Sequence, residues 1–152
     1  MIKQHITDNC KFYKPKNKEK YKGEYPVICR SGWEYQLCQW LDADVRILFW
    51  SSEPFAIQYF NPLTQRKARY YPDYIARTKT DKGKTVTWVI ELKPFKETHP
   101  PLKRGKKKKS TLIYEEKTWK VNHAKWKAAE AFCKQKGWVF KIITEKQLFG
   151  KK

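Results

Sequence analysis

The 152-residue sequence contains no long run of apolar residues. A membrane-spanning helix needs about 18 or more consecutive apolar residues, and residues 1–14 alternate polar and apolar side chains without the apolar core of a signal peptide. We therefore expect a soluble protein that has no membrane partner and is not exported by a signal peptide. The length predicts a single domain, because domains usually hold about 100 to 200 residues.

Closely spaced cysteines are also lacking. The four cysteines are Cys10, Cys29, Cys38 and Cys133, and no two of them have the spacing of about two to four residues that is typical of a structural zinc site. Their scattered positions favour reduced cytosolic thiols over a disulfide framework.

Acidic residues are scarce relative to basic ones. The chain has 15 Asp and Glu against 34 Lys and Arg, which gives a net charge of +19. So basic a surface repels itself unless a polyanion neutralises it, so nucleic acid is the first partner to expect and an anionic membrane surface a distant second. The apolar fraction of 40% and the aromatic fraction of 16% argue against a disordered polyelectrolyte. Charge alone does not distinguish a binding protein from an enzyme.

Two segments concentrate the positive charge. Residues 11–22 combine lysines with no apolar periodicity, which predicts an extended basic arm at 1–24, followed by one domain at 25–152. A solvated tail and a DNA-contacting arm both agree with this composition. The second segment is a predicted basic loop at about 96–112, where prolines precede a dense cluster of Lys and Arg at 103–109.

Apolar periodicity predicts helices on both sides of a run of strands. Apolar residues recur every three to four positions after Ser31, so Ser31 can cap a helix that ends near 42–44. A second helix is predicted from about 114 to a stop at Gly137. Period-two alternation and turn signals predict strands at 45–50, 55–60, 67–71, 73–78, 85–92 and 138–143. This order predicts an α/β fold with a mixed central sheet flanked by helices.

Three carboxylates of this basic chain lie in apolar or strand-end positions that solvation does not explain. Asp73 follows Pro72 at the start of one predicted strand, and Glu91 lies at the end of the next. If these strands pair across the turn at 80–84, Asp73 and Glu91 become neighbours at one edge of the sheet. Lys93 is two residues from Glu91, so strand alternation places both side chains on the same face.

Two carboxylates and a lysine at a strand end are the groups that metal-assisted phosphodiester hydrolysis requires. Carboxylate oxygens bind Mg²⁺ or Mn²⁺, and the Leu92 carbonyl can add a further ligand. The metal polarises the phosphate and activates a water, while the Lys93 ammonium orients that water or offsets charge in the transition state. The sequence therefore predicts a metal-dependent nuclease centred on Asp73, Glu91 and Lys93.

Glu34 is the third carboxylate, and its local sequence leaves two roles open. Ser31 and Glu34 match a capping box, in which each side chain accepts a hydrogen bond from the other residue's backbone N–H. In the functional alternative, Glu34 points from the first helical turn toward the same site and helps to bind the metal.

These motifs together resemble a known group of nucleases. Glu34, Pro72-Asp73 and Glu91-Leu92-Lys93 resemble the PD-(D/E)xK superfamily, which has a restriction-endonuclease-like core. More narrowly, the chain resembles the head-completion nucleases of large contractile-tailed bacteriophages and, more distantly, the TnsA-type transposase endonuclease. The segments that carry this resemblance are Tyr-x-x-x-Cys-Arg-Ser-Gly-Trp-Glu at 25–34, Phe-Trp-Ser-Ser-Glu at 49–53, Arg-Tyr-Tyr-Pro-Asp-Tyr at 69–74, Glu-Leu-Lys-Pro at 91–94 and residues 119–129.

The resemblance implies a metal-dependent DNA nuclease that acts in phage head completion and head–tail joining after packaging. The implied catalytic residues are Glu34, Asp73, Glu91 and Lys93, and the implied ligands of Mg²⁺ or Mn²⁺ are Asp73, Glu91, Leu92 and Glu34. Head, portal or neck proteins are the implied partners, and the implied location is the host cytoplasm during assembly or the virion head or neck. The oligomeric state stays open, with a dimer as one alternative.

DNA contacts are expected from Arg69, beside the predicted site, and from the basic loop, because each neutralised phosphate releases counterions whatever the base sequence. The loop residues are Lys103, Arg104, Lys106, Lys107, Lys108 and Lys109. A solvated loop that contacts nothing is the structural alternative. No base-reading helix is recognisable, so we expect structure-guided or sequence-independent cleavage. The alternative function is a non-catalytic basic DNA-binding protein of the head–neck assembly, with an RNA-binding protein as a third reading.

Overall fold

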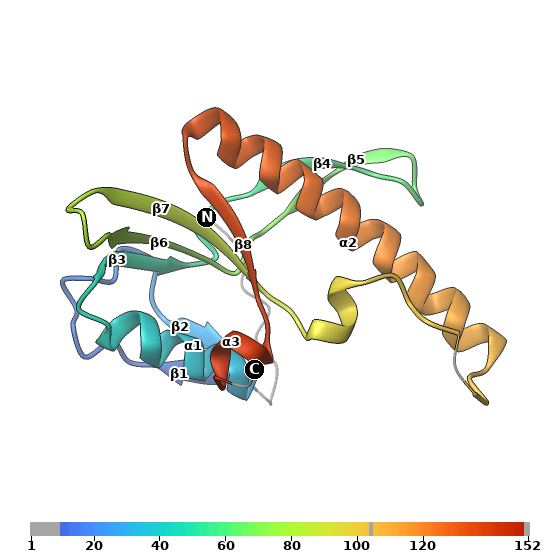
Figure 1. Cartoon of the computed structure of the whole chain (residues 1–152), viewed down its shortest axis with the longest axis horizontal. Coiled ribbons are helices and arrows are strands. Elements are labelled where there is room, and N and C mark those ends of the chain that lie inside the picture. The colour runs from blue at the N-terminus through green and yellow to red at the C-terminus, as the bar shows by residue number, and fades with distance from the viewer. Residues whose placement is uncertain (1–9, 104, 151–152) are drawn as a thin grey trace.

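The computed structural model describes residues 10–103 and 105–150 (Figure 1). The strands are β1 (Lys11–Tyr13), β2 (Val27–Cys29), β3 (Ile47–Ser52), β4 (Ile57–Asn61), β5 (Arg66–Tyr70), β6 (Tyr74–Lys79), β7 (Thr85–Leu92) and β8 (Val139–Ile143). The helices are α1 (Gly32–Ala43), the 3₁₀ helix η1 (Phe95–Thr98), α2 (Lys109–Lys136) and α3 (Glu145–Leu148). Within the described ranges, no helix is long and apolar enough to span a membrane.

A four-stranded sheet with the order β3–β6–β7–β8 forms the centre of the fold. β6 and β7 are antiparallel and pair across the predicted turn, with Tyr74 opposite Ile90. β8 runs parallel to β7, so the sheet is mixed. The mixed sheet and its flanking helices confirm the predicted α/β fold.

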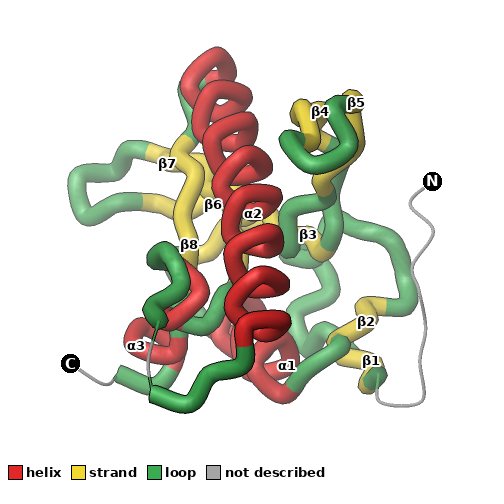
Figure 2. The backbone as a smooth tube through the Cα atoms, turned by 90° about the vertical axis from the view of Figure 1, so that its right-hand side faces the viewer, coloured by secondary structure: helices red, strands yellow, loops and turns green. Residues whose placement is uncertain are grey.

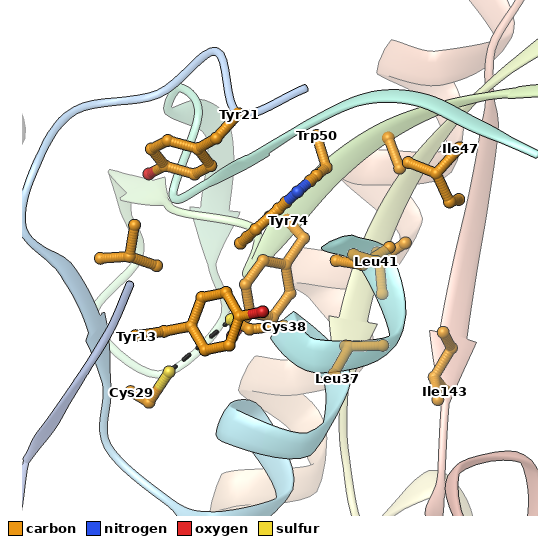
Figure 3. Close-up of a cluster of buried hydrophobic side chains, with 13 residues drawn as sticks. Tyr13, Tyr21, Cys29, Leu37, Cys38, Leu41, Ile47, Trp50, Tyr74 and Ile143 are labelled. Carbon is orange, nitrogen blue, oxygen red and sulfur yellow. Dashed lines mark hydrogen bonds between the residues drawn. The ribbon is translucent and has the colours of Figure 1, made fainter. Parts of the chain in front are cut away.

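The two faces of this sheet pack against different helices, because side chains alternate along each strand. One face lies against α1 in a buried cluster drawn in Figure 3, which includes Leu37, Leu41, Trp50, Ala76 and Ile90. On the other face, Ile75 and Val89 pack against Cys133 of α2. By the same alternation, Glu91 of β7 lies on the face that α2 covers.

The start of α2 differs from the prediction. The helix begins at Lys109, with Lys108 as its N-cap, so it includes the end of the segment that we expected to be a loop at 96–112. η1 also lies within that segment. Most side chains of the first helical turns are exposed, so apolar periodicity did not mark this start. The helix ends as predicted at Gly137, whose φ of 71° is in the left-handed region that glycine adopts without a Cβ clash.

The N-terminal segment is packed, which corrects the extended arm expected at 11–22. β1 pairs with β2, and Tyr13 and Tyr21 are buried in the main core. Asp42 of α1 holds the segment in place by accepting a hydrogen bond of 2.6 Å from the Tyr13 hydroxyl. The tyrosines of this lysine-rich stretch therefore belong to the core, although their spacing shows no period. Residues 1–9 of the expected arm lie outside the described residues.

β4 and β5 form a separate antiparallel hairpin that lies beside α2 (Figure 2). Its inner side packs against Trp126 and Ala129 of the helix through the buried residues Ile57, Tyr59 and Tyr70. The hairpin ends at Tyr70, three residues before Asp73, so its base lies next to the edge of the sheet where the predicted site is located.

Candidate active site

The pairing of β6 with β7 brings Asp73 and Glu91 together, as the sequence predicted. Asp73 immediately precedes β6, and its Oδ2 accepts a hydrogen bond of 2.8 Å from the backbone N–H of Leu92. The two carboxylates are close enough for the charge of Glu91 to raise the pKa of Asp73. The antiparallel register therefore places one carboxylate from each strand at the same edge of the sheet.

Burial disfavours the ionised form of both carboxylates. Burial raises the pKa of Asp73 well above its ordinary value, the charge of Glu91 raises it further, and the Leu92 N–H lowers it. Burial also raises the pKa of Glu91, while the Tyr70 hydroxyl and the Lys93 ammonium lower it. Additional positive charge at this position would favour the ionised form of both groups.

Lys93 lies beside Glu91, as the two-residue spacing predicted. Its Nζ is 3.6 Å from Oε1 of Glu91. The backbone N–H of Lys93 donates a hydrogen bond of 2.9 Å to the carbonyl of Ile143 at the end of β8, which fixes the lysine just beyond β7. A positively charged side chain is thus held against the carboxylate pair.

Tyr70 is a site residue that the sequence analysis missed. Its hydroxyl donates a hydrogen bond to Oε2 of Glu91, and the side chain is buried. Burial and the charge of Glu91 raise the pKa of Tyr70, so the hydroxyl stays protonated and remains a donor at neutral pH. The hairpin supplies this contact, which neither the strand pattern around Tyr70 nor its position beside Tyr71 could reveal.

Lys125 of α2 is a second missed residue. Its Nζ is 5.8 Å from the ring centroids of both Tyr59 and Tyr70. Burial lowers the pKa of Lys125, whereas the nearby charge of Glu91 raises it. The one signal in the sequence was its position next to Trp126, which belongs to the buried stripe of the helix.

Glu34 caps α1 and also acts electrostatically on the site. Its backbone N–H donates a hydrogen bond of 3.1 Å to Oγ of Ser31. Its Oε2 accepts a hydrogen bond of 2.7 Å from the backbone N–H of Arg30, whereas the predicted capping box requires the backbone N–H of Ser31 as the donor. The charge of Glu34 raises the pKa of Asp73. Among the described residues, no three His, Cys, Asp or Glu side chains form a group that could hold a metal.

Glu53 connects the end of β3 to this edge of the sheet. Its backbone N–H donates a hydrogen bond of 2.8 Å to the carbonyl of Asp73, and its φ of 43° lies in the left-handed region. Oε1 pairs with Arg30, while Oε2 is buried without a hydrogen-bond partner in the described parts of the chain. Glu53 is the last residue of the Phe-Trp-Ser-Ser-Glu segment at 49–53, which predicted no role for it.

The cations expected to bind DNA lie in different surroundings. Arg69 is exposed on β5, at the base of the hairpin. The exposed lysines near the start of α2 are Lys103, Lys106, Lys108 and Lys109. Lys107 is half-buried and pairs with Glu115 at 2.9 Å, so its ammonium is engaged within the protein. Arg104 lies outside the described residues.

Comparisons with known proteins cover most of the chain. Residues 44–145 match the family described as TnsA-like endonuclease N terminal. Over 138 residues the chain is 38% identical to the Head completion nuclease of Enterobacteria phage T4, an alignment that covers 86% of this chain and 87% of that protein. No solved structure matches the chain significantly. These matches confirm the resemblance that the motifs indicated.

Proposed function

The chain belongs to the family of TnsA-like endonucleases, which matches most of its length, and from this premise we propose that it is a metal-dependent deoxyribonuclease of phage head completion. One observation carries the proposal. Asp73 and Glu91 lie together at the edge of the sheet, with the Nζ of Lys93 3.6 Å from Glu91. Adjacent carboxylates whose pKa values are raised, with a lysine beside them, are typical of a catalytic centre.

The donor atoms at this edge suit Mg²⁺ or Mn²⁺. The Leu92 N–H donates to Oδ2 of Asp73, so this hydrogen bond does not use Oδ1. Asp73, Glu91 and the Leu92 carbonyl would hold the ion, and water would complete its shell, since Mg²⁺ in proteins usually keeps several waters. When bound, such a metal polarises the phosphate and lowers the pKa of a bound water.

The protein's own residues position the reacting groups. The Tyr70 hydroxyl fixes the carboxylate of Glu91, and the Leu92 N–H fixes that of Asp73. The Lys93 ammonium holds a water or offsets the negative charge that develops on the phosphate. Glu34 stabilises the start of α1 and adds negative charge to the site, and we assign it no direct bond to the metal.

The proposal includes the partners and the location that the resemblance to head-completion nucleases implied, and the relative from phage T4 is named for head completion. DNA is the substrate, bound in part by Arg69 and the exposed lysines near the start of α2, since phosphate contacts of this kind need no base sequence. Head, portal or neck proteins are the protein partners. The place of action is the host cytoplasm during assembly or the virion head or neck.

Cleavage of supercoiled plasmid in Mg²⁺, in Mn²⁺ and in EDTA tests the proposal. Glu91→Gln preserves the shape of the side chain and an acceptor for the Tyr70 hydroxyl but removes the charge, so cleavage should fall by roughly a thousandfold. Glu116→Gln, at an exposed position of α2, is the matched control and should cleave normally. Cleavage that continues in EDTA, or in Glu91→Gln, contradicts the proposal, and DNA binding without any cleavage favours the architectural alternative.

A further inference from the structure

The outer face of the β4–β5 hairpin forms a surface that the catalytic centre does not use. Alternate side chains of the hairpin are buried against α2, so the others face outward. These outward residues are Gln58, Phe60, Lys67 and Arg69. The strand register places Gln58 opposite Arg69 and Phe60 opposite Lys67, so the four side chains form two adjacent cross-strand pairs. Phe60 is 54% exposed, so its ring is accessible between the polar and charged side chains of this outer face.

The hairpin carries cations and no acid. Between residues 57 and 70 the sequence contains Arg66, Lys67 and Arg69 but neither Asp nor Glu. None of these three cations forms an ion pair with another described residue. Unpaired cations that share one small element repel each other, and this repulsion is relieved when phosphates neutralise them.

The turn that joins the two strands is stabilised by its own hydrogen bonds. Oδ1 of Asn61 accepts a hydrogen bond of 2.9 Å from the backbone N–H of Leu63. Nε2 of Gln65 donates a hydrogen bond of 2.8 Å to the carbonyl of Pro62. Leu63 is 46% exposed at the tip. An arm that is already ordered before binding loses less conformational entropy when it docks.

The base of the hairpin is fastened to the catalytic centre. β5 ends at Tyr70, whose hydroxyl bonds to Glu91, and Arg69 precedes it directly. A strand rises about 3.4 Å per residue, so the five residues of β5 extend about 17 Å from the site, which corresponds to about five base pairs of B-DNA. The hairpin can therefore reach along a duplex whose scissile phosphate lies at Glu91.

We propose that the β4–β5 hairpin is a docking arm for duplex DNA and inserts its outer face into the major groove beside the scissile phosphate. A major groove about 12 Å wide admits a two-stranded β-ribbon. Lys67 and Arg69 contact phosphates at the groove edges, and Phe60 packs against sugars or base edges. This inference rests on the proposed nuclease function and adds to it the form and the position of the substrate.

The salt dependence of DNA binding tests the phosphate contacts. We compare Lys67→Ala/Arg69→Ala with the charge-matched control Lys82→Ala/Lys84→Ala, which removes two exposed lysines from the β6–β7 turn. Binding of a 20-base-pair duplex is measured by fluorescence anisotropy in EDTA across a salt series. Each lost phosphate contact lowers the slope of log Kd against log salt by about 0.9. The slope of the hairpin variant should therefore be lower than that of wild type by about 1.8, and the slope of the control should change much less.

A second measurement tests the groove and the reach of the arm. Wild-type cleavage should slow when the duplex on one side of the cut is shortened below about five base pairs, and the hairpin variant should not respond to this shortening. Phe60→Ala should weaken binding to duplex while leaving the salt slope unchanged, because its side chain carries no charge. Circular dichroism verifies that each variant is folded.

The outcomes separate this inference from the nuclease assignment. The docking arm is wrong if the hairpin variant has the same salt slope of DNA binding as its control and the same response of cleavage to a shortened duplex as wild type. The nuclease assignment still holds in that case, provided that wild type cleaves DNA and Glu91→Gln does not. Equal losses of affinity for single-stranded and duplex DNA overturn the groove contact. Hairpin variants that bind and cleave DNA normally but fail to bind head or neck proteins assign the surface to a protein partner instead.

Discussion

The hydroxyl of Tyr70 donates a hydrogen bond to Oε2 of Glu91 across 21 positions of sequence. It ties the last residue of β5 to the end of β7, and thereby the hairpin to the carboxylate pair. The same carboxylate pairs through Oε1 with Lys93, so both oxygens of Glu91 have fixed neighbours. The geometry of the proposed catalytic centre therefore depends on a residue from a separate sheet.

Replacing Tyr70 by Phe tests this dependence. Tyr70→Phe keeps the buried ring but removes the donor to Glu91, so we expect kcat to fall by about tenfold, because a hydrogen bond to a charged group contributes about 1.5 kcal/mol or more. Steady-state cleavage of a labelled duplex in Mg²⁺ measures the effect. Tyr59→Phe is the matched control, since Tyr59 is buried on the same side of the hairpin. Equal activities of the two variants would show that the Tyr70 hydroxyl has no catalytic importance.

Asp73 should make the metal-free protein less stable as the pH rises. Burial raises the pKa of Asp73 above the unfolded value of about 3.9, so between these two values the native state binds more protons than the unfolded state. The free energy of unfolding therefore falls from about pH 4 upward until the pH exceeds the folded pKa. Asp73→Asn removes this loss while keeping an acceptor for the Leu92 N–H.

Urea unfolding of both proteins in EDTA between about pH 4 and pH 8 measures this difference. Asp73→Asn should become more stable than wild type at the upper end, by about 1.4 kcal/mol for each unit of pKa shift, and it should be catalytically inactive. Added Mg²⁺ should stabilise wild type and have little effect on the variant, because a ligand of the native state raises its stability. Identical pH profiles for the two proteins would contradict the predicted shift.

Lys125 is predicted to act as a second cation of the site. Lys125→Met keeps the aliphatic contact with the tyrosine rings and removes the positive charge near Glu91, so kcat/KM should fall by about tenfold, equivalent to about 1.4 kcal/mol. The acid limb of the pH–rate profile should move to higher pH, since the charge of Lys125 lowers the pKa of Glu91. Lys127→Met, at an exposed position of the same helix, is the control. An unshifted acid limb in Lys125→Met argues against this role.

Much of the fold and part of the site followed from local patterns in the sequence. The capped start of α1 at Ser31, the pairing of β6 with β7 and the stop of α2 at Gly137 each depend on residues close together in the chain. The juxtaposition of Asp73 and Glu91 was predictable because one antiparallel turn determines it, and Lys93 followed from strand alternation. The catalytic roles of these residues remain predictions.

The tertiary structure alone decided which distant elements meet this edge of the sheet. Tyr70 and Lys125 reach Glu91 because the hairpin packs against α2, and nothing in the spacing of these residues encodes that packing. Tyr13 joins the core because Asp42 supplies its hydrogen-bond partner, although the surrounding lysines suggested an exposed arm. Periodicity and turn chemistry are properties of neighbouring residues and can be read from the sequence, whereas contacts between separate elements depend on how their faces fit together.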